Sequence, residues 1–409
     1  MHRYTALVQW HCDAAGSNSQ LERRTVAGPL GEEVDRRFEH RGIEHLGRAG
    51  VVGGGDLFVE VDLLRHSRIL AGGGRPACAN IPGVADVVVV GGGLLGLSTA
   101  WALRDRREVV VLEQASIGHV RGGSHGQTRI FRLGYAEAHY VAMAQEAAVL
   151  WRDLEEICGE RLLVPTPQLS FGQAAEDVFA ALVAADVHVG RLTEPQVAAE
   201  FPNFAGHGDA VLETTSAVVL ADRALAALRS ECGADIREGT RVTRVHTDGV
   251  ATDAGTIAAR AVVVCAGPWA RALIPELPTT PTLEHVAYVR TGPGLPIFID
   301  FDEPSVYGLP TPHTDLFKIA HHHTGPVLDP DAEFAPEPRS VAALRDTSER
   351  WFPGAEIVEI DVCPYDNTAD EAFIVERIDG VVVGAGTSGH AFKFGPLLGT
   401  QLAQLVLED

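Results

Sequence analysis

The stretch Asp86–Glu113, DVVVVGGGLLGLSTAWALRDRREVVVLE, decides the fold of this chain. Its run of four valines, Val87–Val90, is typical of a strand that is buried on both faces. A glycine turn follows, and residues from about Leu94 to Arg106 are spaced as in a helix. A second apolar run, Val109–Leu112, predicts another strand. The stretch therefore predicts a βαβ unit, which opens an α/β fold.

Gly91, Gly93 and Gly96 lie directly between the first strand and the helix. A pyrophosphate needs a close backbone approach and a helix N-terminus at this place. Glu113 closes the second strand 17 residues after Gly96, where a carboxylate would meet the hydroxyl groups of an adenosine ribose. Such an acid favours an unphosphorylated ribose. The pattern therefore predicts a bound dinucleotide, FAD or NAD rather than NADP.

A second glycine motif, GAGTSG at Gly384–Gly389, lies about twenty residues before the end of the chain. A second βαβ unit with its own ribose acid does not fit into that length, so a separate nicotinamide site is disfavoured. We expect Gly386 and Gly389 to approach the first cofactor from another side. Because the sequence predicts one dinucleotide site and no separate NAD domain, we expect the bound dinucleotide to be FAD.

Composition excludes several classes of protein. The chain has 409 residues, a net charge of −22, and 46% hydrophobic and 22% charged residues. It is an ordinary globular chain with room for two or three cores, and its acidity argues against generic binding of nucleic acid. The 33 basic residues comprise 31 Arg and only two Lys, Lys318 and Lys393. The longest apolar run, Val87–Leu103, contains four glycines, so no membrane span is predicted.

The six cysteines form no CxxC pair and no zinc spacing, which is typical of a reduced compartment. The first residues, MHRYTALVQWHCDAAG, lack the apolar core of a secretory signal. We therefore expect a cytoplasmic protein.

Helical spacing predicts a helix over Glu137–Cys158, a capping box at Thr193–Gln196 opens another, and a third runs from Asp222 to Gly233. Short β-type runs fill about 235–266. Residues 270–360 are rich in Pro and aromatic residues and predict antiparallel strands and loops. Residues 380–407 again predict a strand and a helix.

These elements suggest three parts. Residues 1–83 differ in composition and form an extension of unknown order. Residues 84–165, 215–275 and 360–409 form a discontinuous, Rossmann-like dinucleotide-binding domain. Residues 166–214 and 276–359 form an α+β substrate domain with an antiparallel sheet.

Six motifs together point to a family. Besides GGGLLG with Glu113, they are GSHGQTRIFR (123–132), CAGPW (265–269), LFKIAHHH (316–323), CPYDNTADEAFIVE (363–376) and GAGTSGHAFKFGP (384–396). From about Asp86 to the C-terminus the chain resembles the monomeric sarcosine oxidase and N-methyltryptophan oxidase family. That family belongs to the D-amino-acid-oxidase-like, FAD-dependent oxidoreductases.

The resemblance implies roles for individual residues. FAD would be bound covalently through the thioether of Cys363. Arg132 and Lys393 would hold the substrate carboxylate, the first by a bidentate fork and the second as a point charge. Lys318 would stabilise the charge that develops as O2 is reduced. Both lysines of the chain thus fall where the family uses an ammonium group.

Weaker matches to the family imply that Tyr307 and His322 line the substrate pocket and that His125 and Arg129 lie beside the flavin ring. The candidate catalytic residues are therefore Lys318, Arg132, Lys393, His322, Tyr307 and Arg129. The expected cofactor contacts are Gly91, Gly93, Gly96, Glu113, Ser124, His125, Thr128, Val242, Gly267, Trp269, Cys363, Tyr365, Gly386, Gly389 and Lys393.

Two residues depart from the family pattern. Asp366 stands where the family usually has Thr, which puts the detail of the site near the flavin in question. Ala391 replaces a preferred Gly, and its methyl group would narrow the cavity. His321–His323 could suggest a metal site, but adjacent strand residues alternate faces and no acid is near them in sequence, so none is predicted.

The resulting hypothesis is an FAD-dependent oxidase of an amino acid with a secondary amine, N-methyl or cyclic. It would form an imine, then an aldehyde and an amine, with O2 as acceptor and hydrogen peroxide as product. We expect a monomer or small homo-oligomer. The alternatives are a tailoring oxidase of a primary or cyclic amino acid in a biosynthetic pathway, and a non-catalytic flavoprotein subunit.

Overall fold

The computed structural model describes residues 36–40, 43–52, 56–61, 83–204 and 208–408. The chain divides into two compact units, Met1–Gly74 and Arg75–Asp409. In the first, strands β1 (Arg36–His40), β2 (Ile43–Val52) and β3 (Asp56–Val61) form an antiparallel sheet in the order β1-β2-β3. The first sixteen residues, on which the expectation about a secretory signal rests, lie outside the described residues, as do residues 17–35, 41–42, 53–55 and 62–82 of the extension.

The second unit begins with the predicted βαβ unit. Strand β4 (Val84–Val90), helix α2 (Leu94–Leu103) and strand β5 (Val109–Leu112) confirm it, and β4 and β5 pair in parallel. The helix ends at Leu103, three residues earlier than expected. The sheet continues with β12 (Asp235–Arg237), β13 (Val242–His246), β14 (Gly249–Thr252), β15 (Gly255–Val264), β21 (Ile374–Ile378) and β22 (Val381–Ala385).

The strand order of this first sheet is β12-β5-β4-β15-β14-β13, and β22 also pairs with β15. Strands β12, β5, β4, β15 and β22 pair in parallel, with β12 at one edge of the sheet, while β13, β14 and β21 add antiparallel strands. The chain thus returns to this sheet with its last strands, as the discontinuous domain requires.

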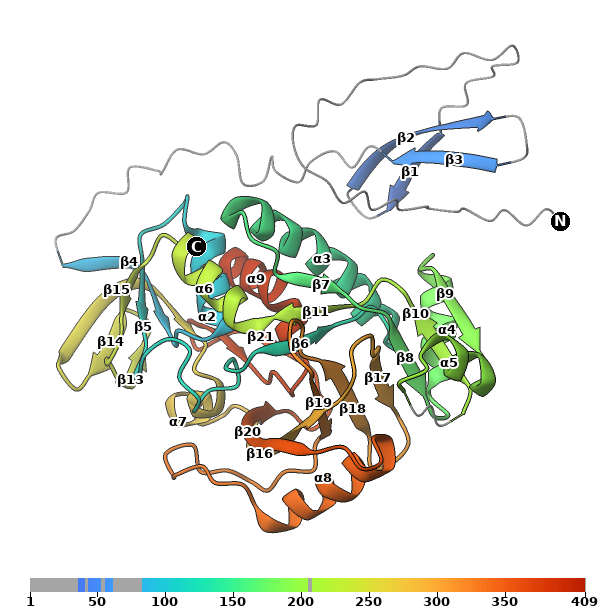
Figure 1. Ribbon diagram of the computed structural model, residues 1–409. Coiled ribbons are helices and arrows are strands. Elements are labelled where there is room, and N and C mark those ends of the chain that lie inside the picture. Colours follow the sequence, from blue (N-terminus) through green and yellow to red (C-terminus); the bar gives the residue numbers. More distant parts are fainter. Residues whose placement is uncertain (1–35, 41–42, 53–55, 62–82, 205–207, 409) are drawn as a thin grey trace. The chain divides into compact units, whose positions relative to one another are not determined.

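Helices cover one face of this sheet (Figure 1). They are α2, α3 (Ala138–Cys158), α6 (Ala221–Glu231) and α9 (Gly395–Leu407). Val87 and Val89 of β4 lie in the core on this face with Trp101 and Trp151. Val88 and Val90 lie in a separate core on the other face. Because side chains alternate along a strand, a run of four valines is needed to fill both cores.

A second sheet has the order β20-β16-β19-β18-β17-β8-β10-β9. Its strands are β8 (Gln168–Phe171), β9 (Val189–Leu192), β10 (Ala210–Glu213), β16 (Thr280–Arg290), β17 (Ile297–Asp300), β18 (Val306–Pro310), β19 (Leu316–His321) and β20 (Ile357–Asn367). All neighbours are antiparallel except β8 and β17. The expected domain boundary at residue 360 falls inside β20.

Helix α8 (Pro338–Trp351) covers the outer face of this second sheet (Figure 1). The antiparallel strands expected in residues 270–360 are present, but helix α8 was not predicted there. Glu337 caps the helix by accepting a hydrogen bond from the Ser340 backbone N–H at 2.8 Å, and Pro338 occupies the first turn. Leu344 and Trp351 fill the core beneath the sheet.

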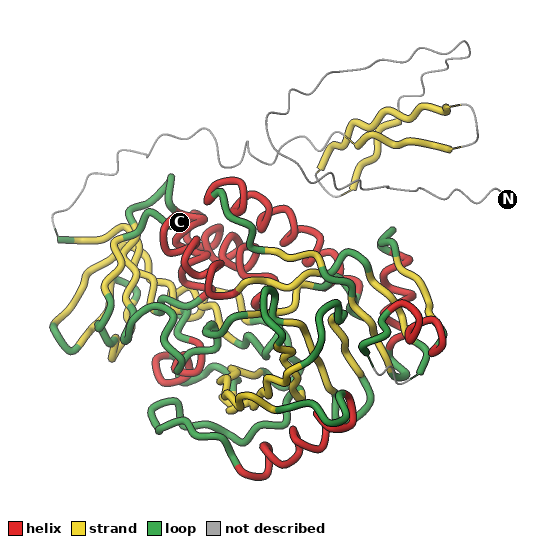
Figure 2. The backbone as a smooth tube through the Cα atoms, in the orientation of Figure 1, coloured by secondary structure: helices red, strands yellow, loops and turns green. Residues whose placement is uncertain are grey.

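The remaining described elements are short or connect the two sheets (Figure 2). They are β6 (Thr128–Phe131), β7 (Leu163–Pro165), β11 (Ala217–Leu220), α4 (Ala175–Ala184), α5 (Glu194–Glu200) and α7 (Ala270–Leu273). Strands β6, β11 and β7 form a small antiparallel sheet. The capping box of Thr193 and Gln196 is confirmed. Among the described residues, no helix combines the length and apolarity that a membrane crossing needs.

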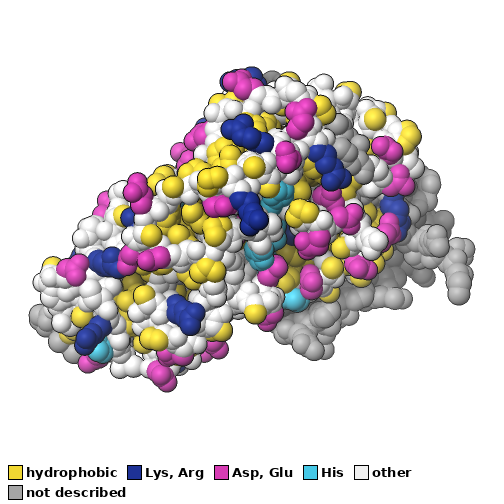
Figure 3. Space-filling model, turned by 90° about the horizontal axis from the view of Figure 1, so that it is seen from below, with side chains coloured by type: hydrophobic (Ala, Val, Ile, Leu, Met, Phe, Trp, Pro, Cys, Tyr) yellow, Lys and Arg dark blue, Asp and Glu magenta, His cyan; other side chains and the backbone are white. Residues whose placement is uncertain are grey.

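On the face seen in Figure 3, Lys and Arg side chains stand scattered among acidic ones. A nucleic-acid backbone needs a continuous basic patch, and this face does not present one.

Helices α2 and α9 pack unusually close because α9 carries two glycines at the contact. A Cβ atom added at Gly399 would lie 2.5 Å from the Ser98 backbone carbon, and one at Gly395 would lie 2.7 Å from the Leu94 side chain. Real Cβ atoms do not approach other atoms this closely. The contact joins the start of the dinucleotide-binding unit to the C-terminal helix.

We predict that Gly399→Ala destabilises the protein. Helix propensity alone would stabilise α9 by about 1 kcal/mol, but backbone atoms of α2 must move, and overpacking costs about 1–3 kcal/mol. The melting temperature of the purified protein is therefore expected to fall. Gly190→Ala is the control, because a Cβ atom there meets no atom within 4 Å. A rise in melting temperature for Gly399→Ala would contradict the close packing.

Candidate active site

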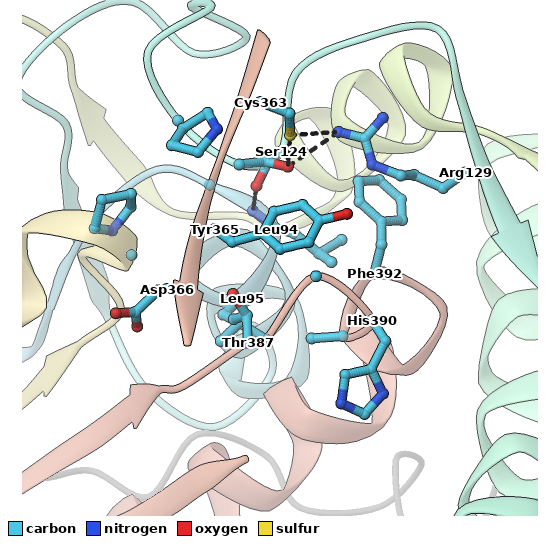
Figure 4. Close-up of a pocket in the computed structure, with 18 of the residues that line it drawn as sticks. Leu94, Leu95, Ser124, Arg129, Cys363, Tyr365, Asp366, Thr387, His390 and Phe392 are labelled. Carbon is cyan, nitrogen blue, oxygen red and sulfur yellow. Dashed lines mark hydrogen bonds between the residues drawn. The ribbon is translucent and has the colours of Figure 1, made fainter. Parts of the chain in front are cut away.

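A cavity of about 700 Å³ lies between the two sheets. Its wall combines the glycine turn before α2, the loop that contains Ser124, strands β18, β19 and β20, and the segment Gly384–Lys393. Figure 4 shows these parts meeting, with Tyr365 of β20 near Leu94 of α2. Segments from both halves of the sequence therefore build one site.

In that view, the Tyr365 ring lies at the centre, beside Leu94, and Leu95 and Thr387 lie below the ring. Strand β20 supplies Tyr365, helix α2 supplies the two leucines, and the turn after β22 supplies Thr387. Three elements that are distant in sequence therefore meet at one aromatic ring.

One end of the cavity carries the predicted dinucleotide motif. Gly91 has φ +105°, and a Cβ atom there would collide with the Cys265 carbonyl group. The first turn of α2 contains no acidic residue, so its N-terminus is free of a competing anion. Glu113 is buried and accepts hydrogen bonds from the backbone N–H groups of Gly92 (2.8 Å) and Ala115 (2.9 Å). These bonds and His119 hold the pKa of Glu113 below its usual value although burial opposes them.

Most of the predicted site residues line this cavity. They are Gly91, Gly93, Glu113, Ser124, Thr128, Arg129, Arg132, Val242, Gly267, Trp269, Tyr307, Lys318, His322, Cys363, Tyr365, Gly389 and Lys393. The structure therefore brings together residues that are up to about 300 positions apart in the sequence.

Three predicted cofactor contacts lie outside the cavity lining. Gly96 faces the turn itself, because a Cβ atom there would collide with the Gly91 carbonyl oxygen. The His125 ring contacts the Gly122 carbonyl oxygen (2.7 Å) and Asp361 (3.6 Å). Gly386 has φ +63° and lies against Thr368. Each of the three serves a contact within the protein.

Gly389 lines the cavity, but a contact within the protein also explains it. Its φ is +71°, and a Cβ atom would collide with the ring of Tyr365. The glycine therefore makes room for that ring. The Tyr365 hydroxyl group also forms a hydrogen bond with the Tyr307 hydroxyl group, with 3.4 Å between the two oxygen atoms. Burial raises the pKa of Tyr307 to about 12, so its hydroxyl group keeps its proton at neutral pH.

Strand alternation points Lys318 into the cavity. Its neighbours Phe317 and Ile319 belong to the core beneath α8, so Lys318 lies on the opposite face of β19. The ammonium group lies 6.0 Å from the ring centre of Tyr288, which pairs with it across the sheet. Burial, and the nearby Arg129 cation, lower the pKa of Lys318 to about 7.

Cys363 lies beside the half-buried guanidinium group of Arg129. Its Sγ atom is 3.8 Å from Arg129 Nη2 and 3.9 Å from the Gly123 carbonyl oxygen. Figure 4 shows the sulfur atom between the Ser124 loop and the guanidinium group. Elsewhere in the cavity wall, burial raises the pKa of Cys265 to about 12, so the Cys265 thiol keeps its proton and is unreactive.

Arg132 and Lys393 form a positive region inside the protein. Arg132 follows β6, donates a hydrogen bond to the Gly134 carbonyl oxygen, and lies over the Tyr135 ring at 4.0 Å. Lys393 is 4% exposed. Burial and the Arg132 cation lower its pKa well below the usual value. In the part of the chain that the structure describes, neither side chain forms an ion pair with a carboxylate.

A directed chain of hydrogen bonds holds Lys393. Its Nζ donates to the Tyr135 hydroxyl group (2.8 Å) and to the His390 carbonyl oxygen (2.8 Å). The Tyr135 hydroxyl group lies 3.2 Å from His390 Nδ1, and His390 Nε2 lies 2.9 Å from the Glu371 carbonyl oxygen. A carbonyl can only accept, so Nε2 donates and Nδ1 accepts from Tyr135. Burial and Lys393 lower the pKa of His390 to about 3, which keeps the ring neutral.

The arguments against a cluster at the three histidines were wrong. Strand β19 ends at His321, so His322 and His323 do not alternate as strand residues, and their rings stack at 3.9 Å. The loop after β20 also brings an acid to them. Glu371 lies 3.1 Å from His323 Nδ1 and 3.8 Å from His322 Nε2.

Asp366, the departure from the family pattern, has a structural role. It is 1% exposed, and its Oδ2 accepts a hydrogen bond from the Gly386 backbone N–H at 2.8 Å. Its carbonyl oxygen accepts another from the Ser388 N–H at 2.9 Å. Burial raises its pKa. The side chain therefore ties β20 to the glycine turn.

Tyr135, His390, Glu371 and Phe392 line the cavity but were not among the predicted site residues. Tyr135 could have been found, because it lies three residues after Arg132, just beyond the motif 123–132. Glu371, His390 and Phe392 lie inside the motifs 363–376 and 384–396, but only the packing of the loop after β20 against the C-terminal segment brings them together at the cavity.

The chain is similar to several characterised oxidases. It is 31% identical to the peroxisomal sarcosine oxidase of Homo sapiens over 360 residues, which cover 79% of this chain and 92% of that protein. It is 29% identical to the N-methyl-L-tryptophan oxidase of Yersinia pestis (strain Pestoides F) over 354 residues, covering 79% and 95%. Among solved structures, the open form of NikD, an unusual amino acid oxidase essential for nikkomycin biosynthesis, superimposes with a TM-score of 0.72.

That superposition covers 80% of this chain and 94% of NikD at 26% identity. The family model described as DAO, FAD dependent oxidoreductase, matches residues 86–405. This match includes every strand of both sheets in the second unit except the first two residues of β4. The chain therefore belongs to the DAO family of FAD-dependent oxidoreductases.

Proposed function

We propose that this enzyme oxidises the C–N bond of an amino acid that carries a secondary amine, N-methyl or cyclic, with O2 as electron acceptor. One C–H bond next to the nitrogen breaks and a C=N bond forms. Water then hydrolyses an acyclic imine to an amine and an aldehyde. The two electrons removed from the substrate end on O2, which leaves as hydrogen peroxide.

The pair of basic side chains, Arg132 and Lys393, is the observation that carries this proposal. Burial and the Arg132 cation disfavour the charged form of Lys393, and the described residues provide neither side chain with a carboxylate partner. A carboxylate bound between the two side chains would pair with Arg132 and favour protonation of Lys393, and the planar fork of Arg132 would set its orientation. An amino acid presents such a carboxylate and holds its amine at a fixed distance from it.

The cavity fits FAD. The glycine turn and the acid-free start of α2 suit a pyrophosphate, Glu113 suits a ribose, and Cys363 lies in the same cavity as Lys318 and Lys393. When bound, FAD supplies the redox chemistry by taking a hydride equivalent from the substrate and returning the electrons to O2. The protein binds and orients the substrate, and Lys318 provides a cation for the charge that develops on oxygen.

A second candidate function is an amino acid oxidase within a biosynthetic pathway. The structural similarity to NikD favours it, and the same cation pair would serve a cyclic or a primary amino acid. The two candidates share the cofactor, the carboxylate contact and the acceptor. They differ only in the amine.

A peroxide assay with a panel of amino acids tests the proposal. The panel contains sarcosine, N-methyltryptophan, pipecolate, proline and glycine, and each is tested as the free acid and as its amide. We expect turnover of at least one secondary amine, and little turnover of the amides, which lack the anion. If only primary amino acids bleach the flavin under anaerobic conditions, the second candidate function is favoured. If no amino acid of the panel bleaches the flavin, both candidate functions are contradicted.

Replacing Arg132 by Gln is expected to raise KM for the amino acid by roughly 10- to 100-fold, because a charge-assisted hydrogen bond is lost. The control is Arg191→Gln, which removes an exposed arginine that pairs with Glu176 and stacks on the Phe179 ring, outside the cavity lining. An unchanged KM in Arg132→Gln would remove this residue from the carboxylate site.

Carboxylate binding is expected to bring proton uptake at Lys393. In the free protein its pKa lies well below the usual value, so the amine is neutral above that pKa. A bound carboxylate raises the pKa, and Lys393 then gains a proton. Calorimetry with butyrate, which carries no amine, in two buffers of different ionisation enthalpy measures this uptake. Affinity should weaken as the pH rises, and Lys393→Met should bind without proton uptake.

Lys318→Met is expected to slow the reaction of the reduced enzyme with O2 by about 100-fold, with little change in flavin content. The wild-type rate should also fall as the pH rises, because the pKa of Lys318 is lowered and the ammonium group loses its proton. Stopped-flow mixing of reduced enzyme with O2 gives both rates. The proposal for this residue fails if Lys318→Met keeps the wild-type rate and pH profile.

Covalent attachment of the flavin through Cys363 is tested by acid precipitation. We expect the yellow flavin to remain in the wild-type pellet and to appear in the supernatant for Cys363→Ala. Cys265→Ala is a matched control, because it removes a buried thiol whose pKa is raised to about 12. Free flavin from the wild-type enzyme would exclude the thioether.

A further inference from the structure

The cluster of His322, His323 and Glu371 lies on the cavity wall, and the steps proposed above for substrate oxidation do not use it. Each residue offers one metal-ligating atom, and these atoms all lie within 4.8 Å of one another. The side chains are 27%, 25% and 47% exposed, so an ion can reach them from solvent. Two neutral imidazoles and a carboxylate are ligands that suit Zn²⁺ and similar ions.

The hydrogen bonds of His323 sharpen this observation. Its Nε2 lies 3.1 Å from the Ser388 carbonyl oxygen, which can only accept, so Nε2 carries a hydrogen. In the neutral ring, Nδ1 then carries a lone pair. That lone pair points at a carboxylate oxygen of Glu371 only 3.1 Å away. Two acceptors at this distance need a cation between them, either a second proton on the ring or a metal ion.

The surroundings match those of a metal site. Histidines that bind metals commonly donate their other N–H to a backbone carbonyl, as His323 does to Ser388. The carbonyl oxygen of Glu371 lies 2.9 Å from His390 Nε2, so its backbone is also held. Both His323 (φ +55°) and Glu371 (φ +59°) adopt the left-handed conformation that non-glycine residues rarely take. Such strain is found where neighbouring structure imposes a functional position.

We propose that His322, His323 and Glu371 bind a divalent transition-metal ion, with Zn²⁺ as the representative. His322 Nε2, His323 Nδ1 and a Glu371 carboxylate oxygen are its protein ligands. Tetrahedral coordination with bonds of about 2.1 Å sets these atoms about 3.4 Å apart. Rotation of the three partly exposed side chains brings the ligand atoms to this spacing. The fourth position is open to the cavity and takes water.

Zinc binding by the full-length holoenzyme, measured calorimetrically with zinc chloride after chelator treatment and dialysis, tests the proposal. We expect His323→Gln and Glu371→Gln to bind Zn²⁺ at least tenfold more weakly than the wild type. His246→Gln, which removes an exposed histidine of β13, should bind as the wild type does. Flavin absorbance and melting temperature verify that each variant is folded.

His323→Cys provides a second test, because it keeps a metal ligand at the position but removes the imidazolium. We expect it to retain Zn²⁺ binding, whereas a simple ion pair between histidine and carboxylate gives no such rescue. The proposal is overturned if the wild type binds no Zn²⁺, or if His323→Gln and Glu371→Gln keep the wild-type affinity. Both readouts are independent of oxidase turnover.

Discussion

The close contact between helices α2 and α9 is the constraint on which the site depends. Helix α2 begins at the glycine turn that opens the dinucleotide motif, and α9 begins two residues after Lys393. Because Gly395 and Gly399 let the helices approach, Lys393, the proposed substrate-binding lysine, and the glycine turn before α2 share one cavity. A bulkier residue at either glycine would separate two functional groups that are about 300 residues apart in the sequence.

Basic side chains in the cavity wall then give the proposed site its chemistry. Lys318 and Lys393 are buried and Arg129 is half-buried. Burial lowers the pKa of both lysines, and the neighbouring cations, Arg129 for Lys318 and Arg132 for Lys393, lower it further. Protonated lysines are therefore unfavourable in isolation. In the proposed reaction they become favourable when negative charge arrives: a carboxylate beside Arg132 and Lys393, and developing charge on oxygen beside Lys318.

Alternation along the second sheet directs side chains either to structure or to the site. Phe317 and Ile319 pack beneath α8, while Lys318 between them faces the cavity. Gly308 follows the same rule, because a side chain there would collide with Phe298 and Phe317 in the core. One strand pattern therefore explains why an ammonium group lies buried beside an aromatic core without entering it.

The sequence by itself determined the βαβ unit and the family, and most of the site residues predicted from it line the cavity. The βαβ unit depends on local spacing, because four valines fill two cores and glycines permit a turn. The sequence also predicted where both lysines act, which is a proposal for experiment. Helix α8 was missed although Glu337, Pro338 and an apolar face give it a helical pattern, because the prolines of the surrounding region favoured strands and loops.

Only the tertiary structure decided which groups meet. The cluster of His322, His323 and Glu371 arises because β19 ends one residue before it and the loop after β20 folds back. The bonds from Lys393 through Tyr135 to His390 likewise join three segments. Contacts between distant segments depend on how whole elements pack, and residue spacing along one chain carries no record of that packing.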